Sequence, residues 1–581
     1  MHAAASRHRS ESLRNVWEYG NALNTLVAAS APNNPFGQDI VVSVPMVGGD
    51  GAFISTLDIG QLSAGANFAL WGGWKLGADA TAGQSKLKLS GPESRDLADS
   101  VYTGAMDVLR DTTAHPFDVS EFWQDWKTSP FRTATREMTL LLGGPLAPLP
   151  AGPLTLTASV QRREERYTGG EEWRNDGPGT PFNQIITRGK QSLFVTSAYS
   201  ELRAPLIPRE LARAGLHGLE LQLAVRFDSY TTDVALAHAE SEDRGEDDYA
   251  RADFSSWNGV AGLRYQPTPG MTFRASYSTG FLPPRVSDLV PPRERRFGAG
   301  AFIDERRGGE PTADVLILAG GNPLLRPERS ASTSVGFLLK PGNVPNFRLS
   351  IDGVRIVKTD NIYVVGELAF DNLLRYEEMF PERVTREAVA AGDAYGIGRI
   401  RTIDATNINA ARMEVVSVDV DLRYAKDVPH LGLLEVASMG TWVADFKMQP
   451  TPLAPLREYV GTTAERPLEF RATLGLSVTK GRWGYGWDVR YFGPYKVSDE
   501  PQIVSNQGTL KVSHQVFHDT YVSWQTEGLE GLPKAVELRL GVRNVFDVRP
   551  RFDAGAAGNS YYSRVGDPRL AAYYLAVTAG F

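Results

Sequence analysis

Segments of about nine to thirteen residues in which apolar and polar side chains alternate recur along this chain, and they restrict its fold more than any other feature. Two of them flank the short turn at 480–482. On one parity they carry Phe470, Ala472, Leu474, Leu476 and Val478, and then Trp483, Tyr485, Trp487, Val489 and Tyr491. A period of two places each set on one face of a β-strand. The pattern returns at 219–227, 257–265, 271–277 and 416–424, so the sequence predicts an all-β chain.

The length of these strands and their polar second face indicate which class of all-β protein this chain belongs to. Strands of soluble sandwiches average about five or six residues, whereas several segments here are longer and carry aromatic residues near their ends. Long alternating strands with aromatic ends are typical of a membrane barrel that faces lipid outside and water inside. A soluble β-sandwich remains compatible with the alternation alone. A mean hydropathy of −0.25, without any run of about 18 apolar residues, excludes a helical membrane bundle.

The connections between the predicted strands alternate between short and long. The short ones lie at 267–270, 341–346, 426–431, 480–482 and 527–534, and the long ones at about 280–331, 359–412, 447–466, 493–513 and 544–569. Bacterial outer-membrane barrels show this asymmetry, with short periplasmic turns and long extracellular loops. The sequence therefore predicts an antiparallel transmembrane β-barrel whose C-terminus lies on the periplasmic side. Strand assignment before about residue 150 is weak, because 91–133 shows no regular alternation.

The N-terminal residues and the composition restrict the domain organisation and the partners that we expect. We expect residues 1–30 to form an irregular or helical segment derived from a loop, and 31–581 to form the barrel. The N-terminus carries basic residues but no apolar run, so we do not expect it to act as a secretory signal peptide. The chain has no Cys, which excludes disulfide scaffolds and thiol chemistry. The net charge of −7 offers no basic footprint, and we expect no nucleic-acid partner.

The last predicted strand carries a separate signal. One parity of it holds Tyr573, Leu575, Val577, Ala579 and the terminal Phe581. Such a strand, ending on an aromatic residue, resembles the terminal strand of bacterial outer-membrane proteins, which the barrel assembly machinery reads. We interpret these five residues as an outer-membrane assembly signal. The alternative is an ordinary edge strand that ends in Phe.

Several further segments resemble one family in its own order. They are PNNPFGQDI at 32–40, SAYSELRAPL at 197–206, ASYSTGFLPPRVSDL at 275–289, GGNPLLRPERS at 320–330 and LRLGVRNVFDVRP at 538–550. Each is a weak signal, but five in order, together with the terminal strand, are strong. Over about 30–581 the chain resembles the C-terminal barrel of TonB-dependent outer-membrane receptors.

The resemblance implies import rather than catalysis. Such receptors sit in the outer membrane of Gram-negative bacteria and take up a large, scarce ligand, usually a ferric siderophore, a cobalamin or an oligosaccharide. The partners implied are outer-membrane lipid and lipopolysaccharide, the barrel assembly machinery, the small-molecule ligand and, when a plug domain is present, the TonB complex. Polar rows on the strands, which would contact that plug or solvate the lumen, are Arg264, Arg274, Asp419, Asp421, Arg423, Asp488 and Arg490.

The chain also departs from this family. The family's barrel has 22 strands and follows a plug domain, whereas we count about 16 to 18 candidate strands here and find neither a plug nor a signal peptide. We therefore expect a truncated form of such a receptor. Two other functions stay open: a passive porin-like or adhesin barrel, and a soluble secreted β-protein that binds glycans.

Candidate site residues are few. Five arginines gather in the long loop at about 280–331, namely Arg293, Arg295, Arg296, Arg306 and Arg307. They would bind an anionic ligand by bidentate pairing, or contact lipopolysaccharide phosphates, or simply be solvated. His514 and His518 lie on a predicted strand, where a separation of four residues is roughly 13 Å and too far for one metal ion. Without a nucleotide loop, nucleophile elbow or metalloprotease motif, we expect no enzyme, no catalytic residue, no metal and no cofactor.

Overall fold

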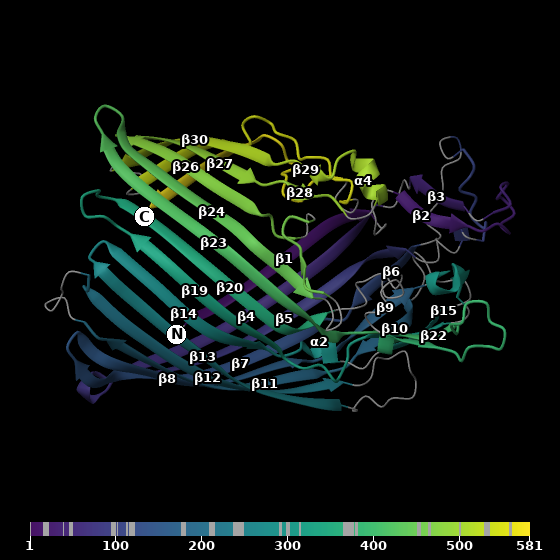
Figure 1. Cartoon of the computed structure of the whole chain (residues 1–581), viewed down its shortest axis with the longest axis horizontal. Coiled ribbons are helices and arrows are strands. Elements are labelled where there is room, and N and C mark those ends of the chain that lie inside the picture. The colour runs from purple at the N-terminus through teal and green to yellow at the C-terminus, as the bar shows by residue number, and fades with distance from the viewer. Residues whose placement is uncertain are drawn as a thin grey trace.

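The structure is a computed structural model. The residues it describes are 2–15, 22–38, 40–45, 50–94, 100–101, 103–111, 114, 123–175, 182–207, 215–235, 249–289, 293–297, 303–312, 315–363, 377, 381–449, 455–462, 466–498, 501–527, 535–556 and 561–580. Most of them belong to long, tilted strands that form the wall of a β-barrel (Figure 1).

The wall is a sheet of 22 strands. Four of these are short, namely β6 (Trp123–Thr128), β9 (Gly170–Asn175), β10 (Phe182–Arg188) and β25 (Arg457–Glu458). The long ones are β1 (His2–Asn15), β4 (Asp50–Ala69), β5 (Lys75–Ser94), β7 (Phe131–Leu149), β8 (Gly152–Tyr167), β11 (Gln191–Pro205), β12 (Gly218–Ala235), β13 (Tyr249–Thr268), β14 (Met271–Leu282), β19 (Glu328–Leu339), β20 (Phe347–Tyr363), β23 (Ile408–Val428), β24 (Gly432–Gln449), β26 (Phe470–Lys480), β27 (Trp483–Phe492), β30 (Gln515–Glu527), β31 (Ala535–Arg543) and β32 (Ala572–Gly580).

Each long strand pairs antiparallel with the next long strand along the chain, from β1 with β4 to β31 with β32. The antiparallel barrel predicted from the alternation is confirmed, and so are the short turns at 267–270, 341–346, 426–431 and 480–482. Of the turn predicted at 527–534, residues 528–534 lie outside the described residues. β13 ends at Thr268 and β14 begins at Met271, while β26 ends at Lys480 and β27 begins at Trp483. β1 and β32 are the first and last strands of this series.

The two faces of the wall differ as the alternation requires. One face exposes large apolar side chains, such as Met138 at 67%, Leu223 at 56% and Leu575 at 69%. Aromatic pairs lie at both ends of this apolar band: Tyr265 stacks near Phe273 close to the short turns, and Phe227 lies 4.9 Å from Trp257 toward the long loops. Tyr265 and Trp257 lie on the same strand, and their eight-residue separation spans about 27 Å. A barrel needs an outer apolar band of about this height to cross a bilayer.

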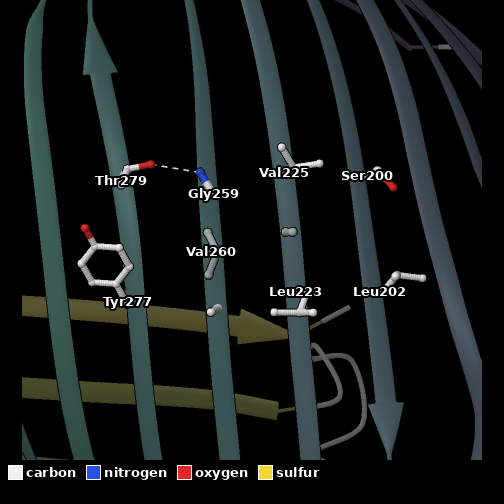
Figure 2. A pocket seen from close by; sticks show the side chains of 10 residues that line it. Ser200, Leu202, Leu223, Val225, Gly259, Val260, Tyr277 and Thr279 are labelled. Atoms are coloured by element: carbon white, nitrogen blue, oxygen red, sulfur yellow. Dashed lines mark hydrogen bonds between the residues drawn. The ribbon is translucent and has the colours of Figure 1, made fainter.

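Figure 2 shows a hollow on the outer face of the wall. A pocket of about 500 Å³ is lined by Leu202, Leu223, Val260 and Tyr277, which come from the four neighbouring strands β11 to β14. Gly259 brings no side chain to it, and its amide donates to Thr279 Oγ1 at 3.0 Å. The hollow belongs to the apolar outer surface rather than to the interior.

The long connections carry structure of their own. Their strands are β2 (Ala22–Val27), β3 (Ile40–Pro45), β15 (Arg293–Phe297), β16 (Ile303–Asp304), β17 (Glu310–Pro311), β18 (Val315–Gly320), β21 (Val384–Arg386), β22 (Ile400–Thr406), β28 (Tyr495–Lys496) and β29 (Lys511–Val512), and their helices are α2 (Val286–Leu289), α4 (Pro501–Gln507) and the 3₁₀ turns η4 (Glu305–Arg307) and η7 (Pro381–Arg383). A further 3₁₀ turn, η1 (Trp71–Gly73), joins β4 to β5. β2, β3, β15, β22, β28, β29 and α4 gather at one end of the barrel, and the ends marked N and C lie toward the other (Figure 1).

Residues 1–30 differ from the expectation of an irregular or helical segment. His2–Asn15 is the strand β1, which pairs along its whole length with β4. Arg7 holds Asp58 of β4 by two hydrogen bonds of 2.5 and 3.0 Å. Neither face of β1 is consistently apolar. Its sequence therefore lacks the alternation of apolar and polar residues from which the other strands were predicted. No helix within the described ranges is long and apolar enough to cross a membrane.

Candidate functional site

Two of the long connections fold together into one unit at the loop end of the barrel. β18 of the first pairs in parallel with β22 of the second, and β15 and β21 complete a four-stranded sheet. Its core is fully buried at Val315, Ile317, Ile403 and Ala405. We call the described residues 293–320 and 377–406 the loop unit. Because burying these apolar side chains is favourable, the two loops fold into one fixed structure and do not remain separate, solvated segments.

One arginine ties the loop unit together. Arg386 of β21 donates to both carboxylate oxygens of Asp304, at 2.6 and 3.0 Å, and to both of Glu377, at 2.8 and 2.6 Å. It also donates to the carbonyl oxygen of Gly398 at 2.9 Å. The side chains of Asp304 and Glu377 are 5% and 7% exposed. The hydrogen bonds to these carboxylates raise the pKa of Arg386, and the three charges form a closed bidentate clamp.

Arg307, one of the five predicted ligand arginines, lies inside the loop unit. Its Nε donates to Glu310 at 2.5 Å and its Nη2 to Asp393 at 2.8 Å, and its guanidinium lies 5.0 Å from the centre of the Tyr395 ring. The hydrogen bonds from Arg307 lower the pKa of both Asp393 and Glu310. Arg307 is 5% exposed, so its charge is used within the fold.

The other predicted arginines belong to the same unit. Arg306 has a side chain that is 45% exposed and lies 3.2 Å from Glu377. Arg293, Arg295 and Arg296 lie on β15, opposite β18, and their side chains lie outside the described part of the structure. The structure therefore brings all five arginines into one pair of loops and leaves Arg306 accessible to a ligand.

A second cluster joins the last two long connections. Tyr495 of β28 is 1% exposed; its hydroxyl donates to Asp553 at 2.6 Å and lies 2.9 Å from the Ser563 hydroxyl. Gln515 donates to that same hydroxyl at 2.9 Å. Burial, together with the hydrogen bond to Asp553, raises the pKa of Tyr495. Val497 and Val512 pack beside the ring. One buried polar network thus joins the connection between β27 and β30 to the connection between β31 and β32.

The inner face of the wall is lined with paired charges. Arg226 donates to Asp228 and to Ser197 at 2.9 Å, and Arg274 of β14 reaches across β19 to Asp352 of β20 at 2.7 Å. The predicted polar rows lie on this face: Arg264 is opposite Arg274, Asp352 is opposite Asp419, and Arg490 contacts Asp519. The interior is therefore polar, as a water-filled or plugged lumen requires.

A recess of about 470 Å³ opens on this inner face near the short turns. It is lined by Asn346, Arg423, Tyr424, Ala425, Glu435, Val436, Ala437, Gly475, Leu476, Ser477, Asp488, Tyr521 and Arg539. Asn346 belongs to the turn between β19 and β20, which fixes the level of the recess. The Arg539 guanidinium lies 4.3 Å from the centre of the Tyr521 ring. Two cations and two carboxylates there can hydrogen-bond a polar surface placed against them.

The terminal strand lies where the alternation predicted it. Tyr573, Leu575 and Val577 are 78%, 69% and 62% exposed on the outer face of β32, and Ala579 shares their parity. Phe581 lies outside the described residues. The assembly role of this row stays a prediction.

The sequence analysis missed the acidic partners Asp304, Glu377 and Asp393. Asp304 and Asp393 lie 82 and 86 residues from the arginines that bind them. Glu377 lies nine residues from Arg386, but no local motif marks any of the three. The one available signal was the apolar run at 315–319 inside a polar loop, which marks a folded core. His518 Nδ1 accepts a hydrogen bond from Trp487 Nε1 at 3.1 Å. Nowhere in the described ranges do three His, Asp or Glu side chains gather as ligands for a metal ion.

Comparisons with known proteins agree with this geometry. The sequence matches the family model "TonB dependent receptor-like, beta-barrel" over residues 10–545. A search of curated protein sequences gave no significant match.

Three solved structures share the fold. The pyoverdine outer membrane receptor FpvA from Pseudomonas aeruginosa PAO1, bound to pyoverdine, has a TM-score of 0.53 and 11% identity, with 100% of this chain and 68% of that chain covered. The unliganded ferric citrate transporter FecA has a TM-score of 0.50 and 10% identity, with 90% and 60% covered. The ferric-catecholate import receptor Fiu from E. coli K12 has a TM-score of 0.50 and 10% identity, with 100% and 72% covered. This chain thus spans less than two thirds of the ferric citrate transporter's length.

Proposed function

Because the chain belongs to the TonB-dependent receptor β-barrel family, we propose that it forms the barrel of an outer-membrane receptor for the energised uptake of a large, scarce ligand. The observation that carries this proposal is the two-faced wall: an exposed apolar band outside, and paired charges inside. A wall of this kind is stable only with lipid on one side and water or protein on the other.

The ligand class that we propose is a ferric siderophore. The similar structures named above include receptors for pyoverdine and ferric citrate, and cobalamin or an oligosaccharide are the other candidates. The loop unit supports capture of an anionic complex, because Arg306 is accessible on a rigid support and Arg293, Arg295 and Arg296 lie on the neighbouring β15. Planar guanidinium groups bind carboxylates and related anions with two parallel hydrogen bonds.

We propose that the TonB complex drives this uptake by acting on a domain held inside the barrel. Asp421 Oδ1 and Arg490 Nε are buried atoms of the inner wall that have no hydrogen-bond partner among the described residues. Buried polar atoms normally find partners, and a polar domain packed against the inner face of the wall would supply them. We also propose that the barrel assembly machinery recognises β32 through its outer row of side chains, which includes Tyr573, Leu575 and Val577.

The test is uptake in Gram-negative cells that carry or lack this gene. Cells grown under iron limitation receive ⁵⁵Fe-labelled pyoverdine, ferric citrate or a ferric catecholate, and ⁵⁷Co-labelled cobalamin is the iron-free comparison. Fractionation of the membranes reports whether the chain reaches the outer membrane. We expect gene-dependent uptake of one iron complex that stops when a protonophore collapses the proton gradient.

Other results would assign a different function. Gene-dependent entry of small sugars that ignores the protonophore would indicate a passive pore. Attachment of cells to a surface, without gene-dependent uptake of any labelled ligand, would indicate an adhesin. Recovery of the chain in the soluble secreted fraction would contradict the receptor altogether.

A further inference from the structure

The last long connection, between β31 and β32, folds back on itself as a short antiparallel ribbon. The backbone amide of Asp553 donates to the carbonyl oxygen of Tyr561 at 2.9 Å, and a β-bridge forms between the residues on either side of this pair, Phe552 and Tyr562. We call the described residues 551–563 of this connection the aromatic ribbon.

The base of the aromatic ribbon is fixed to the neighbouring connection. Asp553 and Ser563 are 2% and 1% exposed and belong to the buried network around Tyr495. Gln507, the last residue of α4, donates from its side chain to the carbonyl oxygen of Phe552 at 3.1 Å and accepts from another backbone amide of the ribbon at 2.8 Å. A ribbon held in this way presents its exposed side chains in one arrangement, which lowers the entropic cost of binding.

The exposed surface of the aromatic ribbon consists largely of rings. Phe552 and Tyr561 are 52% and 50% exposed, and their stacked rings have centroids 6.0 Å apart and planes inclined by 26°. Tyr562 is 45% exposed. Exposed apolar patches that are rimmed by polar residues mark binding surfaces. The rings therefore form a platform on which a flat group can stack.

Tyr561 holds its ring at a conformational cost. Its φ of +61° lies in the left-handed region, which a bulky side chain seldom adopts. Gly or Asn would meet the same backbone conformation at a lower cost. Strained residues of this kind persist where the surrounding structure holds them, and they cluster at ligand-binding sites. The ring at position 561 is therefore explained by what it contacts rather than by the turn.

The accessible charges around the platform are positive. The exposed cations of the connection are Arg549, Arg551, Arg564 and Arg569. Its three carboxylates are engaged within the fold: Asp547 accepts from the Ala571 amide, Asp553 from the Tyr495 hydroxyl, and Asp567 from Arg569. The surface thus joins stacking faces to guanidinium groups, a combination that suits a flat ligand with negative charge.

We propose that the aromatic ribbon binds a ferric chelate whose iron ligands are phenolates or catecholates on planar aromatic rings. The rings of such a chelate stack on Phe552 and Tyr561, and its negative charge pairs with the surrounding guanidinium groups. Ferric citrate offers the charge without the rings. This inference rests on the proposed function and restricts its ligand to an aromatic chelate.

The test compares two chelates by isothermal titration calorimetry of the full chain in detergent: a hexadentate ferric tricatecholate, and ferric citrate. The ring variant is Phe552→Ser/Tyr561→Asn, in which Asn tolerates the left-handed conformation at position 561. The control, Phe36→Ser/Leu109→Asn, removes two exposed apolar side chains from the connections that precede β6. A third variant, Phe552→Tyr/Tyr561→Phe, keeps both rings. Heat-modifiable mobility in gels shows whether each variant forms the barrel.

Each stacked pair of rings contributes a factor of about two to ten in affinity. We therefore expect the ring variant to bind the tricatecholate about five- to a hundredfold more weakly than wild type and control, with no loss of affinity for ferric citrate. The variant that keeps both rings should bind like wild type. Equal tricatecholate affinity of ring variant and control would overturn the proposal. So would an equal loss for both chelates, or a wild-type chain that does not bind the tricatecholate.

The two proposals fail in different ways. A wild-type chain that is absent from the outer-membrane fraction, or that imports none of the labelled ligands, contradicts the receptor and the aromatic site together. A chain that imports ferric citrate or cobalamin by means of the proton gradient, but does not bind the tricatecholate, contradicts the aromatic site alone.

Discussion

Replacing Arg386 by Met tests whether the loop unit is held by its charge clamp. The substitution leaves Asp304 and Glu377 without their cation, although their side chains are only 5% and 7% exposed. Removing one partner of a buried ion pair typically costs about 3–5 kcal/mol, because the remaining charge stays desolvated. Arg306 lies 3.2 Å from Glu377 and compensates only that carboxylate. We therefore expect the loop unit to open by local unfolding while the barrel stays folded.

The measurement is amide hydrogen exchange of β18 and β22, followed by mass spectrometry. A loss of about 3–5 kcal/mol speeds exchange about a hundred- to a few thousandfold, up to the limit set by the stability of the unit. Arg251→Gln is the control, since its ion pair with Asp253 is 65% and 59% exposed and such pairs contribute less than about 1 kcal/mol.

A compensated variant sharpens this test. In Asp304→Asn/Glu377→Gln/Arg386→Met no charge of the clamp remains buried, so slow exchange should largely return. The reasoning is refuted when Arg386→Met exchanges no faster than the Arg251→Gln control. It is also refuted when the compensated variant exchanges as fast as Arg386→Met alone.

Three further changes test other parts of the structure. Tyr495→Phe leaves the buried carboxylate of Asp553 one hydrogen bond short, so we expect about 1–3 kcal/mol less local stability, measured as faster amide exchange in 501–512. Gly486→Val places a Cβ about 2.0 Å from the Tyr521 ring, so the ring must shift at a cost of about 1–3 kcal/mol; we expect a lower temperature for the heat-modifiable transition in gels, and an unchanged or higher temperature would contradict this reasoning. Leu223→Arg puts a charge on the apolar outer face at a cost of about 2–4 kcal/mol near the bilayer midplane, so less chain should reach the outer-membrane fraction, and an unchanged amount would contradict the lipid-facing assignment.

The barrel wall could be predicted because its information is local. The alternation that begins at Phe470 and resumes at Trp483 gave both strands and the turn between them, since a period of two needs no knowledge of distant residues. β1 escaped prediction for the same reason: its residues are polar on both faces, and only the hydrogen bonds to β4 make it a strand.

The candidate site was less accessible to sequence reasoning. The cluster of arginines around Arg307 predicted an anion site, and the partners of Arg307 are indeed carboxylates, but they belong to the chain itself. Asp393 lies 86 residues from Arg307 in sequence, and the parallel pairing of β18 with β22 brings them together. Pairings between separate loops follow no local period, so a sequence without its fold cannot assign them.

The order of the strands has a consequence for how the wall is put together. Since every long strand bonds to its neighbour in the chain, each hairpin can be added as soon as it is made, with little loop entropy to overcome. Pairing between neighbours in the chain also keeps the sequence separation of contacting residues small for most of the wall, which favours fast formation of each hairpin.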